Sequence, residues 1–307
     1  MIATSRIGWS ERRRQPPSAT DRFSKSSPVR ILRAGDQHWT IKHRKKMQII
    51  VPIKQVPDVA LNIKVKDGEI VQEGISWVIS SWDETALEAA LQLTEEAGGE
   101  VTVLSIGTAK VQEALRKALA LGAHQALHIQ CDSSAGWDSY QVAKVLAKTL
   151  ADQDYNLIIT GKQAQDSDAG LTPTMLAEFL GLPQVTNITA FKDVSDASIT
   201  LHRKGDDGIE ISKMTLPGVV TVNDSLAEPR LASMRGIMMA KKKPMETVDI
   251  HSLGLAPEVL QSGGLMTEVV QYEKPDERKE GRRFEGDETE TVPEVMQNLK
   301  KNIGLFA

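Results

Sequence analysis

The sequence has almost no cysteine, no histidine motif and no long apolar run. Cys131 is the only cysteine among 307 residues, which excludes an internal disulfide and a multi-cysteine metal or iron–sulfur site and fits a reducing compartment. The 6 histidines show no HExxH or comparable spacing, so zinc catalysis is not expected. Apolar runs such as 157–160 and 219–222 are far shorter than the roughly 20 residues of a membrane-spanning helix. We therefore expect no metal site and no membrane insertion.

Acidic residues are scarce at the start of the chain. Residues 1–46 contain eight Arg and four Lys against Glu11, Asp21 and Asp36, a net charge of about +9. Because the formal total is −4, residues 47–307 carry about −13. The chain is therefore an acidic body preceded by a basic leader.

Three interpretations of this leader remain open. One is a gene start placed too far upstream, with initiation at Met47. Another is a cleaved organellar transit peptide, because the segment is rich in Arg and Ser. A nucleic-acid-binding arm is disfavoured, because the acidic body repels phosphate. We expect residues 1–46 to be disordered and nucleic acid not to bind. We expect a bacterial protein of the cytoplasm. If residues 1–46 are instead a transit peptide, we expect the protein in the mitochondrial matrix.

Strands and helices are predicted to alternate after the leader. Short apolar runs predict strands at 47–54, 100–106, 126–129 and 156–160. Helical periodicity predicts helices between and after them, starting at Asp83 and covering 111–121, 139–150 and 171–180. Because parallel strands require crossover connections, this alternation predicts an α/β fold with a doubly wound, mostly parallel sheet of the Rossmann-like class.

The pattern changes after Pro183. Segments 185–191, 198–203 and 209–214 are predicted to form an antiparallel hairpin addition, and 217–222 one more buried strand. We expect residues 47–244 to form a single α/β domain. Residues 245–307 are mostly polar and cannot form a core of their own, so they predict an extended C-terminal arm that packs on a partner.

Three predicted strand ends carry small and polar residues, at 52–54, 105–107 and 161–172. Ligands of open parallel sheets bind beyond the carboxyl ends of the strands. The third segment has glycines for close backbone approach and precedes a helix N-terminus, which favours an anion. It contains neither a Walker A nor a GxGxxG motif, no Ser-His-Asp arrangement and no Cys nucleophile. The pattern indicates a nucleotide site without catalytic machinery, and glycines that only form turns are an open alternative.

A series of motifs in the body resembles electron-transfer flavoprotein β subunits. The matching segments read KQVPD at 54–58, WDETALEAA at 82–90, ALRKALALGA at 114–123, GKQA at 161–164, DDGIE at 206–210, EPR at 228–230 and AKKK at 240–243. The order and spacing of these motifs agree with that family from Met47 to about Pro244. The chain is therefore similar to the small subunit of such a carrier.

This resemblance implies an electron carrier and not an enzyme. In the family, α and β subunits form a heterodimer with one redox-active FAD, held mainly by α. The β subunit binds an AMP without a redox role. Electrons would come from flavin dehydrogenases, such as an acyl-CoA dehydrogenase of fatty acid β-oxidation, and pass to a quinone oxidoreductase.

The resemblance also implies an AMP site at the strand ends already described. Carried over by position, its residues are Pro52, Ser80, Ser81, Trp82, Asp83, Ile106, Gly161, Lys162, Gln163, Ala164, Gln165, Asp166, Ser167, Asp168, Ala169, Gly170, Leu171 and Thr172.

A partner-docking segment is implied between the EPR and AKKK motifs. Its residues are Leu231, Met234, Arg235, Ile237 and Met238, with Met234 at the position of the apolar residue that enters the dehydrogenase. Burial of these apolar residues in the core is an open alternative. Arg235-Gly236 replaces a Pro-Asn pair common in animal members, which leaves the identity of the partner open.

Two other functions remain as alternatives. Electron-bifurcating members of the family hold a second FAD in place of AMP, and their loop typically reads DGDTAQVGP. Here the loop keeps Asp166 and Asp168 but loses the Thr-Ala-Gln run, which favours AMP. A stand-alone adenine-nucleotide-binding protein of the universal-stress type is disfavoured by the long polar arm.

Overall fold

The computed structural model describes residues 46–58, 60, 63–71, 73–134, 136–261, 264–273 and 280–303. The predicted leader lies outside the described residues except for Lys46.

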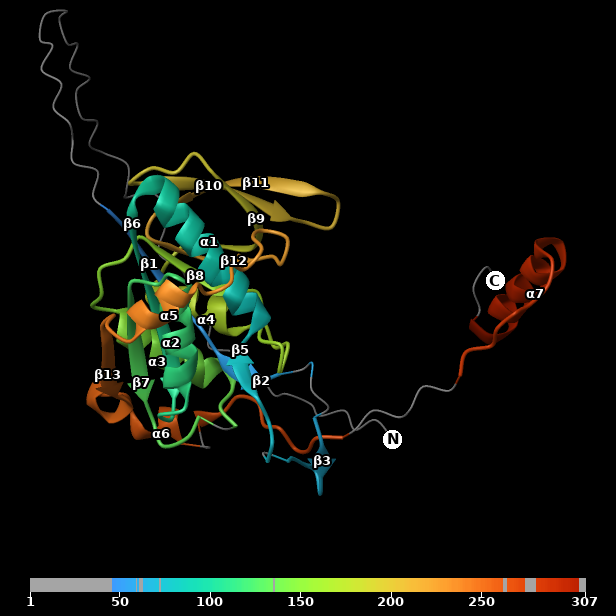
Figure 1. The fold of residues 1–307 in the computed structure, drawn as a ribbon, viewed down its shortest axis with the longest axis horizontal. Helices are drawn as coiled ribbons and strands as arrows, with labels where there is room; N and C mark the ends of the chain where they lie inside the picture. The colour runs from blue at the N-terminus through green and yellow to red at the C-terminus, as the bar shows by residue number, and fades with distance from the viewer. Residues whose placement is uncertain are drawn as a thin grey trace, which may run out of the picture. The chain divides into compact units, whose positions relative to one another are not determined.

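Within the described residues, one large sheet of nine strands forms the centre of the fold (Figure 1). The strand order is β11-β10-β9-β12-β8-β1-β6-β7-β13. Their bounds are β1 Met47–Pro52, β6 Gly99–Gly107, β7 Gln125–Gln130, β8 Leu157–Gly161, β9 Gln184–Lys192, β10 Ser198–Lys204, β11 Ile209–Thr215, β12 Gly218–Val222 and β13 Met245–Asp249. In the order β9-β12-β8-β1-β6-β7-β13, each strand is parallel to its neighbours. This confirms the predicted α/β class.

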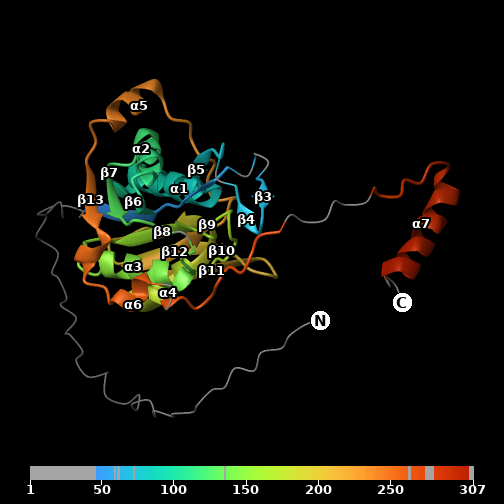
Figure 2. The same cartoon turned by 90° about the horizontal axis from the view of Figure 1, so that it is seen from below.

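Helices cover both faces of this sheet (Figure 2). Helices α1 (Ser81–Ala97) and α2 (Val111–Leu121) lie on one face, and α3 (Ser139–Leu150) and α4 (Thr172–Leu180) on the other. Successive side chains of β1 alternate between the two cores: Ile49 and Val51 pack in the α1–α2 layer, and Ile50 in the α3–α4 layer. This alternation explains why the strand reads as a continuous apolar run.

The chain reverses its direction of travel across the sheet next to β1. Through α1 and α2 it adds β6 and β7 on one side of β1, and through α3 it returns to place β8 on the other side. The loops after β1 and β8 therefore diverge, which opens a crevice at their carboxyl ends.

The predicted antiparallel addition is present as β9, β10 and β11. Strand β9 has a second role, because its other edge pairs in parallel with β12. The hairpin is thus a continuation of the main sheet. Its buried apolar residues, Ile188, Ile199, Leu201 and Met214, belong to the α1–α2 core.

The first residues of the predicted arm complete the opposite edge of the sheet. Strand β13 pairs in parallel with β7, and Ile250 after it is 2% exposed. A short 3-10 helix (Ile250–Leu253), α6 (Pro257–Leu260) and α7 (Glu288–Ile303) follow. No helix among the described residues is long and apolar enough to cross a membrane.

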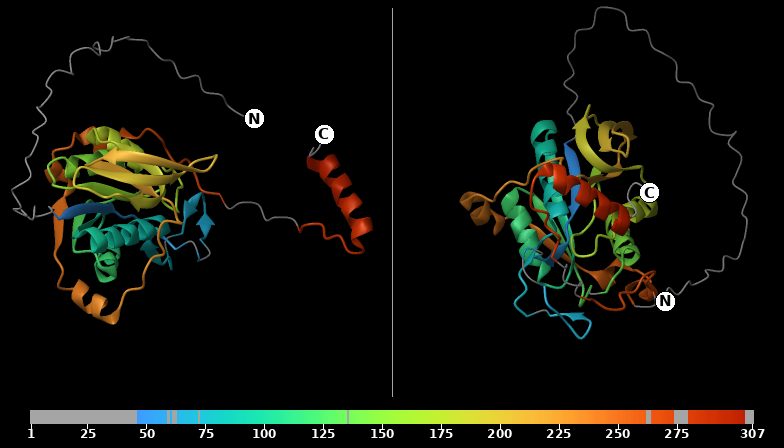
Figure 3. Two further views of the ribbon diagram at one scale, coloured as in Figure 1. Left: turned by 90° about the horizontal axis from the view of Figure 1, so that it is seen from above. Right: turned by 90° about the vertical axis from the view of Figure 1, so that its right-hand side faces the viewer.

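Smaller elements complete the fold. Strands β2 (Gln55–Pro57) and β5 (Trp77–Ile79) pair with each other, and β3 (Val65–Lys66) and β4 (Glu69–Ile70) form a hairpin. Helix α5 (Met234–Ala240) packs against α2 and, in both views of Figure 3, lies on the outside of the α1–α2 layer.

Candidate functional site

One carboxylate joins the carboxyl ends of β1 and β8. Asp83 lies in the first turn of α1. Its Oδ2 accepts a hydrogen bond of 2.8 Å from the backbone N–H of Lys54, and its Oδ1 accepts one of 3.2 Å from that of Gly161. Asp83 therefore sets the separation of the two strand ends at the point where the sheet opens.

Burial changes the protonation of this carboxylate. Asp83 is 8% exposed, and loss of hydration raises its pKa from 3.8 to about 7, against the opposing effect of the two backbone hydrogen bonds. The carboxyl therefore keeps its proton to a much higher pH than an exposed aspartate does.

Gly161 is required by the closeness of α1 to β8. A Cβ at this position would lie 2.5 Å from Oδ1 of Asp83, 2.7 Å from Cβ of Trp82 and 2.9 Å from the backbone carbon of Trp82. Only a glycine allows the helix N-terminus to approach the strand end this closely. Packing of α1 against the end of β8 therefore requires a glycine at the first position of the GKQA motif.

Residues 161–172, between β8 and α4, are connected to the elements around them. The Nζ of Lys54 lies 2.7 Å from Oδ2 of Asp166, and the backbone N–H of Ser81 donates to Oε1 of Gln165 at 3.1 Å. The Nζ of Lys162 lies 5.7 Å from the ring centre of Trp82. The structure therefore brings this loop together with the Ser80–Asp83 turn.

The second half of the loop has an unusual backbone. Asp168 and Gly170 have φ angles of 50° and 63°, and Nε2 of Gln163 donates to Oδ1 of Asp168 at 2.8 Å. The left-handed backbone turns the chain into α4, where Leu171 is the N-cap and Thr172 the first helical residue.

Pro52 and Ile106 lie at the ends of two neighbouring strands, β1 and β6, and Pro52 is in register with Leu104. Two hydroxyls near these ends, Ser80 Oγ and Ser105 Oγ, are buried without a hydrogen-bond partner within the described part of the chain. Buried hydroxyls normally have partners. They fit a polar ligand at this edge, such as the ribose or base of a nucleotide.

A pocket of about 240 Å³ opens next to the loop. It is lined by Lys162, Gln163, Gly170, Thr186, Asn187 and Thr221. The first three were predicted from the sequence and the last three were not. Polar residues at the end of the buried run 219–223 are the signal that could have indicated Thr221.

The backbone of Asn187 explains how this wall is formed. Asn187 has a φ of 62°, its N–H donates to Oγ1 of Thr221 at 2.9 Å, and its Oδ1 accepts from Nδ2 of Asn223 at 2.8 Å. The middle of β9 is thereby joined to the carboxyl end of β12 beside the pocket.

The second candidate surface is the apolar segment, which we define as residues 231–239. Leu231 is 94% exposed, Met234 78% and Met238 69%. Ile237 is also exposed, and so is Arg235. Burial of these residues in the core, the open alternative from the sequence, is therefore wrong. The segment is an apolar surface on the outside of the fold, and exposed apolar patches commonly bind other proteins.

Helix α5 is held close to α2 at its start. Oγ of Ser233 accepts from the N–H of Gly236 at 3.0 Å, and a Cβ at Gly236 would lie 2.4 Å from the backbone oxygen of Ala120. Gly236 thus allows a close contact between α5 and α2.

Arg116 and Lys243 satisfy carbonyls at the C-terminal ends of α2 and α5 and in the residues that follow each helix. Arg116 of α2 donates to the carbonyl oxygens of Ala240 and Lys243 at 2.8 and 3.3 Å. Lys243 in turn donates to those of Leu119 and Ala123 at 2.9 and 2.6 Å. These bonds satisfy carbonyls that helix ends leave without partners.

Comparisons with known proteins agree with this architecture. A family model described as an electron transfer flavoprotein domain matches residues 67–253. The chain is 32% identical over 255 residues to the electron transfer flavoprotein subunit beta of Bacillus subtilis, covering 83% of this chain and 98% of that one. It is 38% identical over 215 residues to the subunit beta of Mycobacterium leprae, covering 67% and 80%. The protein of the same name from Bradyrhizobium diazoefficiens is 34% identical over 265 residues, covering 85% and 100%.

Proposed function

The chain belongs to the family of electron-transfer flavoprotein β subunits, and from this membership we propose that it binds AMP between the ends of β1 and β8. It forms a heterodimer with an α subunit that holds most of the FAD. The FAD supplies the redox chemistry of the carrier when bound, and the AMP supplies none. A stand-alone nucleotide-binding role is disfavoured by the family membership.

Three features at the carboxyl ends of the parallel strands support the AMP site, and the loop after β8 supports it best. The loop 161–172 ends at the N-terminus of α4, whose free amides attract a phosphate. Lys162 adds a cation beside the pocket. The buried hydroxyls of Ser80 and Ser105 supply hydrogen-bonding groups for the nucleoside.

The experiment that tests this proposal is a measurement of nucleotide content. The chain is co-expressed with its α subunit, the purified complex is denatured, and released nucleotides are quantified by chromatography. We expect one FAD and one AMP per heterodimer. Two FAD and no AMP would instead establish the bifurcating function and contradict our interpretation of the loop.

The apolar segment is proposed to dock flavin dehydrogenases, such as an acyl-CoA dehydrogenase, before electrons pass to a quinone oxidoreductase. Residues 231–243 contain Arg235 and three lysines and no acidic residue, in a body that is otherwise acidic. A partner with an apolar pocket and an acidic rim fits this surface.

Met234→Ala should impair docking without affecting the fold. Because Met234 is 78% exposed, its truncation leaves no cavity, and loss of an apolar contact with the partner should raise KM for the dehydrogenase about tenfold. Steady-state reduction of the heterodimer by an acyl-CoA dehydrogenase measures this effect. Ile211→Ala is a matched control, since Ile211 is 69% exposed on β11. A fall in AMP or FAD content in Met234→Ala would contradict the docking role.

A further inference from the structure

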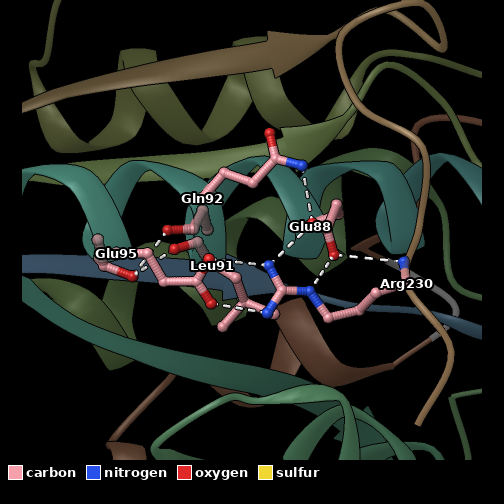
Figure 4. A network of polar contacts seen from close by, with 7 residues as sticks. Glu88, Leu91, Gln92, Glu95 and Arg230 are labelled. Carbon is pink, nitrogen blue, oxygen red and sulfur yellow. Dashed lines mark hydrogen bonds and ion pairs between the residues drawn. The ribbon is translucent and has the colours of Figure 1, made fainter.

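Arg230, immediately before the apolar segment, binds two carboxylates of α1 (Figure 4). Its Nε donates to Oε2 of Glu88 at 2.7 Å and its Nη2 to Oε1 at 2.9 Å. Its Nη1 and Nη2 donate to the two oxygens of Glu95 at 2.6 and 3.1 Å. Every nitrogen of the guanidinium is therefore bonded to α1.

The carboxylate of Glu88 depends on this contact because it is buried. Its side chain is 5% exposed, and Nε2 of Gln92 donates to Oε1 at 2.8 Å. Burial alone would raise the pKa of Glu88, but the hydrogen bonds from Arg230 and Gln92 hold the pKa below its ordinary value. Glu88 is therefore a buried anion that keeps Arg230 in place, unlike most surface ion pairs.

The backbone of Arg230 is bonded to α1 as well as its side chain. The N–H of Arg230 donates to Oε2 of Glu88 at 3.3 Å, and the next residue, Leu231, is 94% exposed. The contact with Glu88 thus fixes where the exposed segment begins relative to α1. At the far end of the apolar segment, Arg116 and Lys243 join α5 to α2. Both ends of the exposed surface are attached to the rigid helical layer.

We infer that Arg230 is a positioning residue for docking: through Glu88 and Glu95 it orders the apolar segment before a partner binds. This inference rests on the proposed docking function. A surface that is already ordered loses less conformational entropy on association. Detachment from α1 reduces the fraction of molecules with a docking-competent segment, and KM rises by the inverse of that fraction.

The test uses the complete heterodimer with two variants. Arg230→Met removes the guanidinium but leaves Glu88 as a buried charge without its partner, which can prevent folding. Arg230→Met/Glu88→Met removes that charge too and restores apolar packing. Lys148→Met, an exposed lysine on α3, controls for the loss of one positive charge in the single variant, and the double variant leaves the net charge unchanged.

The measurements are amide hydrogen exchange of residues 231–243 and the KM and kcat for reduction by an acyl-CoA dehydrogenase. In the folded double variant we expect faster exchange in this peptide, unchanged exchange in α3 and a KM raised about tenfold. We expect kcat and nucleotide content to stay the same.

Two outcomes separate the inference from the function on which it rests. Unchanged exchange of residues 231–243 in the folded double variant overturns the positioning role of Arg230. If Met234→Ala leaves KM unchanged, the proposed docking function is contradicted instead. The hydrogen-exchange result then decides by itself whether Arg230 orders the apolar segment.

Discussion

Gly161→Ala should abolish retention of AMP and destabilise the chain. The added methyl would lie 2.7 Å from Cβ of Trp82 and 2.9 Å from its backbone carbon, and neither atom can move without shifting the start of α1. Overpacking of this kind costs about 3 kcal/mol. Displacement of α1 also separates Asp83 from the two strand ends.

Two measurements check this prediction: the AMP released per heterodimer and the free energy of unfolding in urea. Gly181→Asn is the control, because Gly181 ends α4 with a φ of 64° and nothing within 4 Å of an added Cβ. Asn tolerates this backbone conformation, so AMP content and stability should be nearly unchanged. A Gly161→Ala variant with one AMP per heterodimer and normal stability would show that the helix and strand can separate freely.

Asp83→Asn should change how stability depends on pH. The folded pKa of about 7 lies above the ordinary value of 3.8, so between these values the folded chain binds a proton that the unfolded chain has released. The contribution to stability is therefore complete below about pH 4 and is lost as the pH rises to 7. Over that range it amounts to about 4 kcal/mol.

The asparagine variant lacks this titration. The free energy of unfolding of the native chain, relative to that of the variant, should fall by about 2 kcal/mol between pH 5 and pH 7. Urea unfolding of the full chain at several pH values measures this difference. A difference that does not change with pH would contradict the raised pKa.

Asp83→Asn should also weaken nucleotide binding. An amide side chain has one acceptor oxygen where the carboxylate has two, so it cannot accept from both Lys54 and Gly161. One strand end then loses its bond to α1. We expect a lower AMP content above pH 7, where Asp83 is mostly a carboxylate, measured on the same preparations by chromatography of released nucleotides.

The sequence by itself determined the fold class and the position of the candidate edge. Apolar runs such as β1 and β8, separated by helical periodicity, specify a parallel sheet, because each strand must be covered on both faces. The loop 161–172 could be identified for the same reason, since polar residues and glycines directly after a buried strand mark its carboxyl end.

Tertiary structure decided which residues lie beside that loop. Thr186, Asn187 and Thr221 line the pocket, but they come from β9 and β12. Strand β9 was expected to pair only as an antiparallel strand, and its parallel pairing with β12 brings Asn187 to the pocket. Local sequence pattern does not specify which strands become neighbours, because that depends on how all the layers pack together.

Exposure of the apolar segment was also decided only in three dimensions. Helical spacing of Met234, Ile237 and Met238 is the same whether the face that they form is buried or exposed. Here Gly236 and the reciprocal bonds of Arg116 and Lys243 place α5 outside α2, and Arg230 attaches the preceding chain to α1. Neighbouring residues thus encode the elements and their ends, and contacts between residues more than a hundred positions apart determine which surfaces remain free to bind.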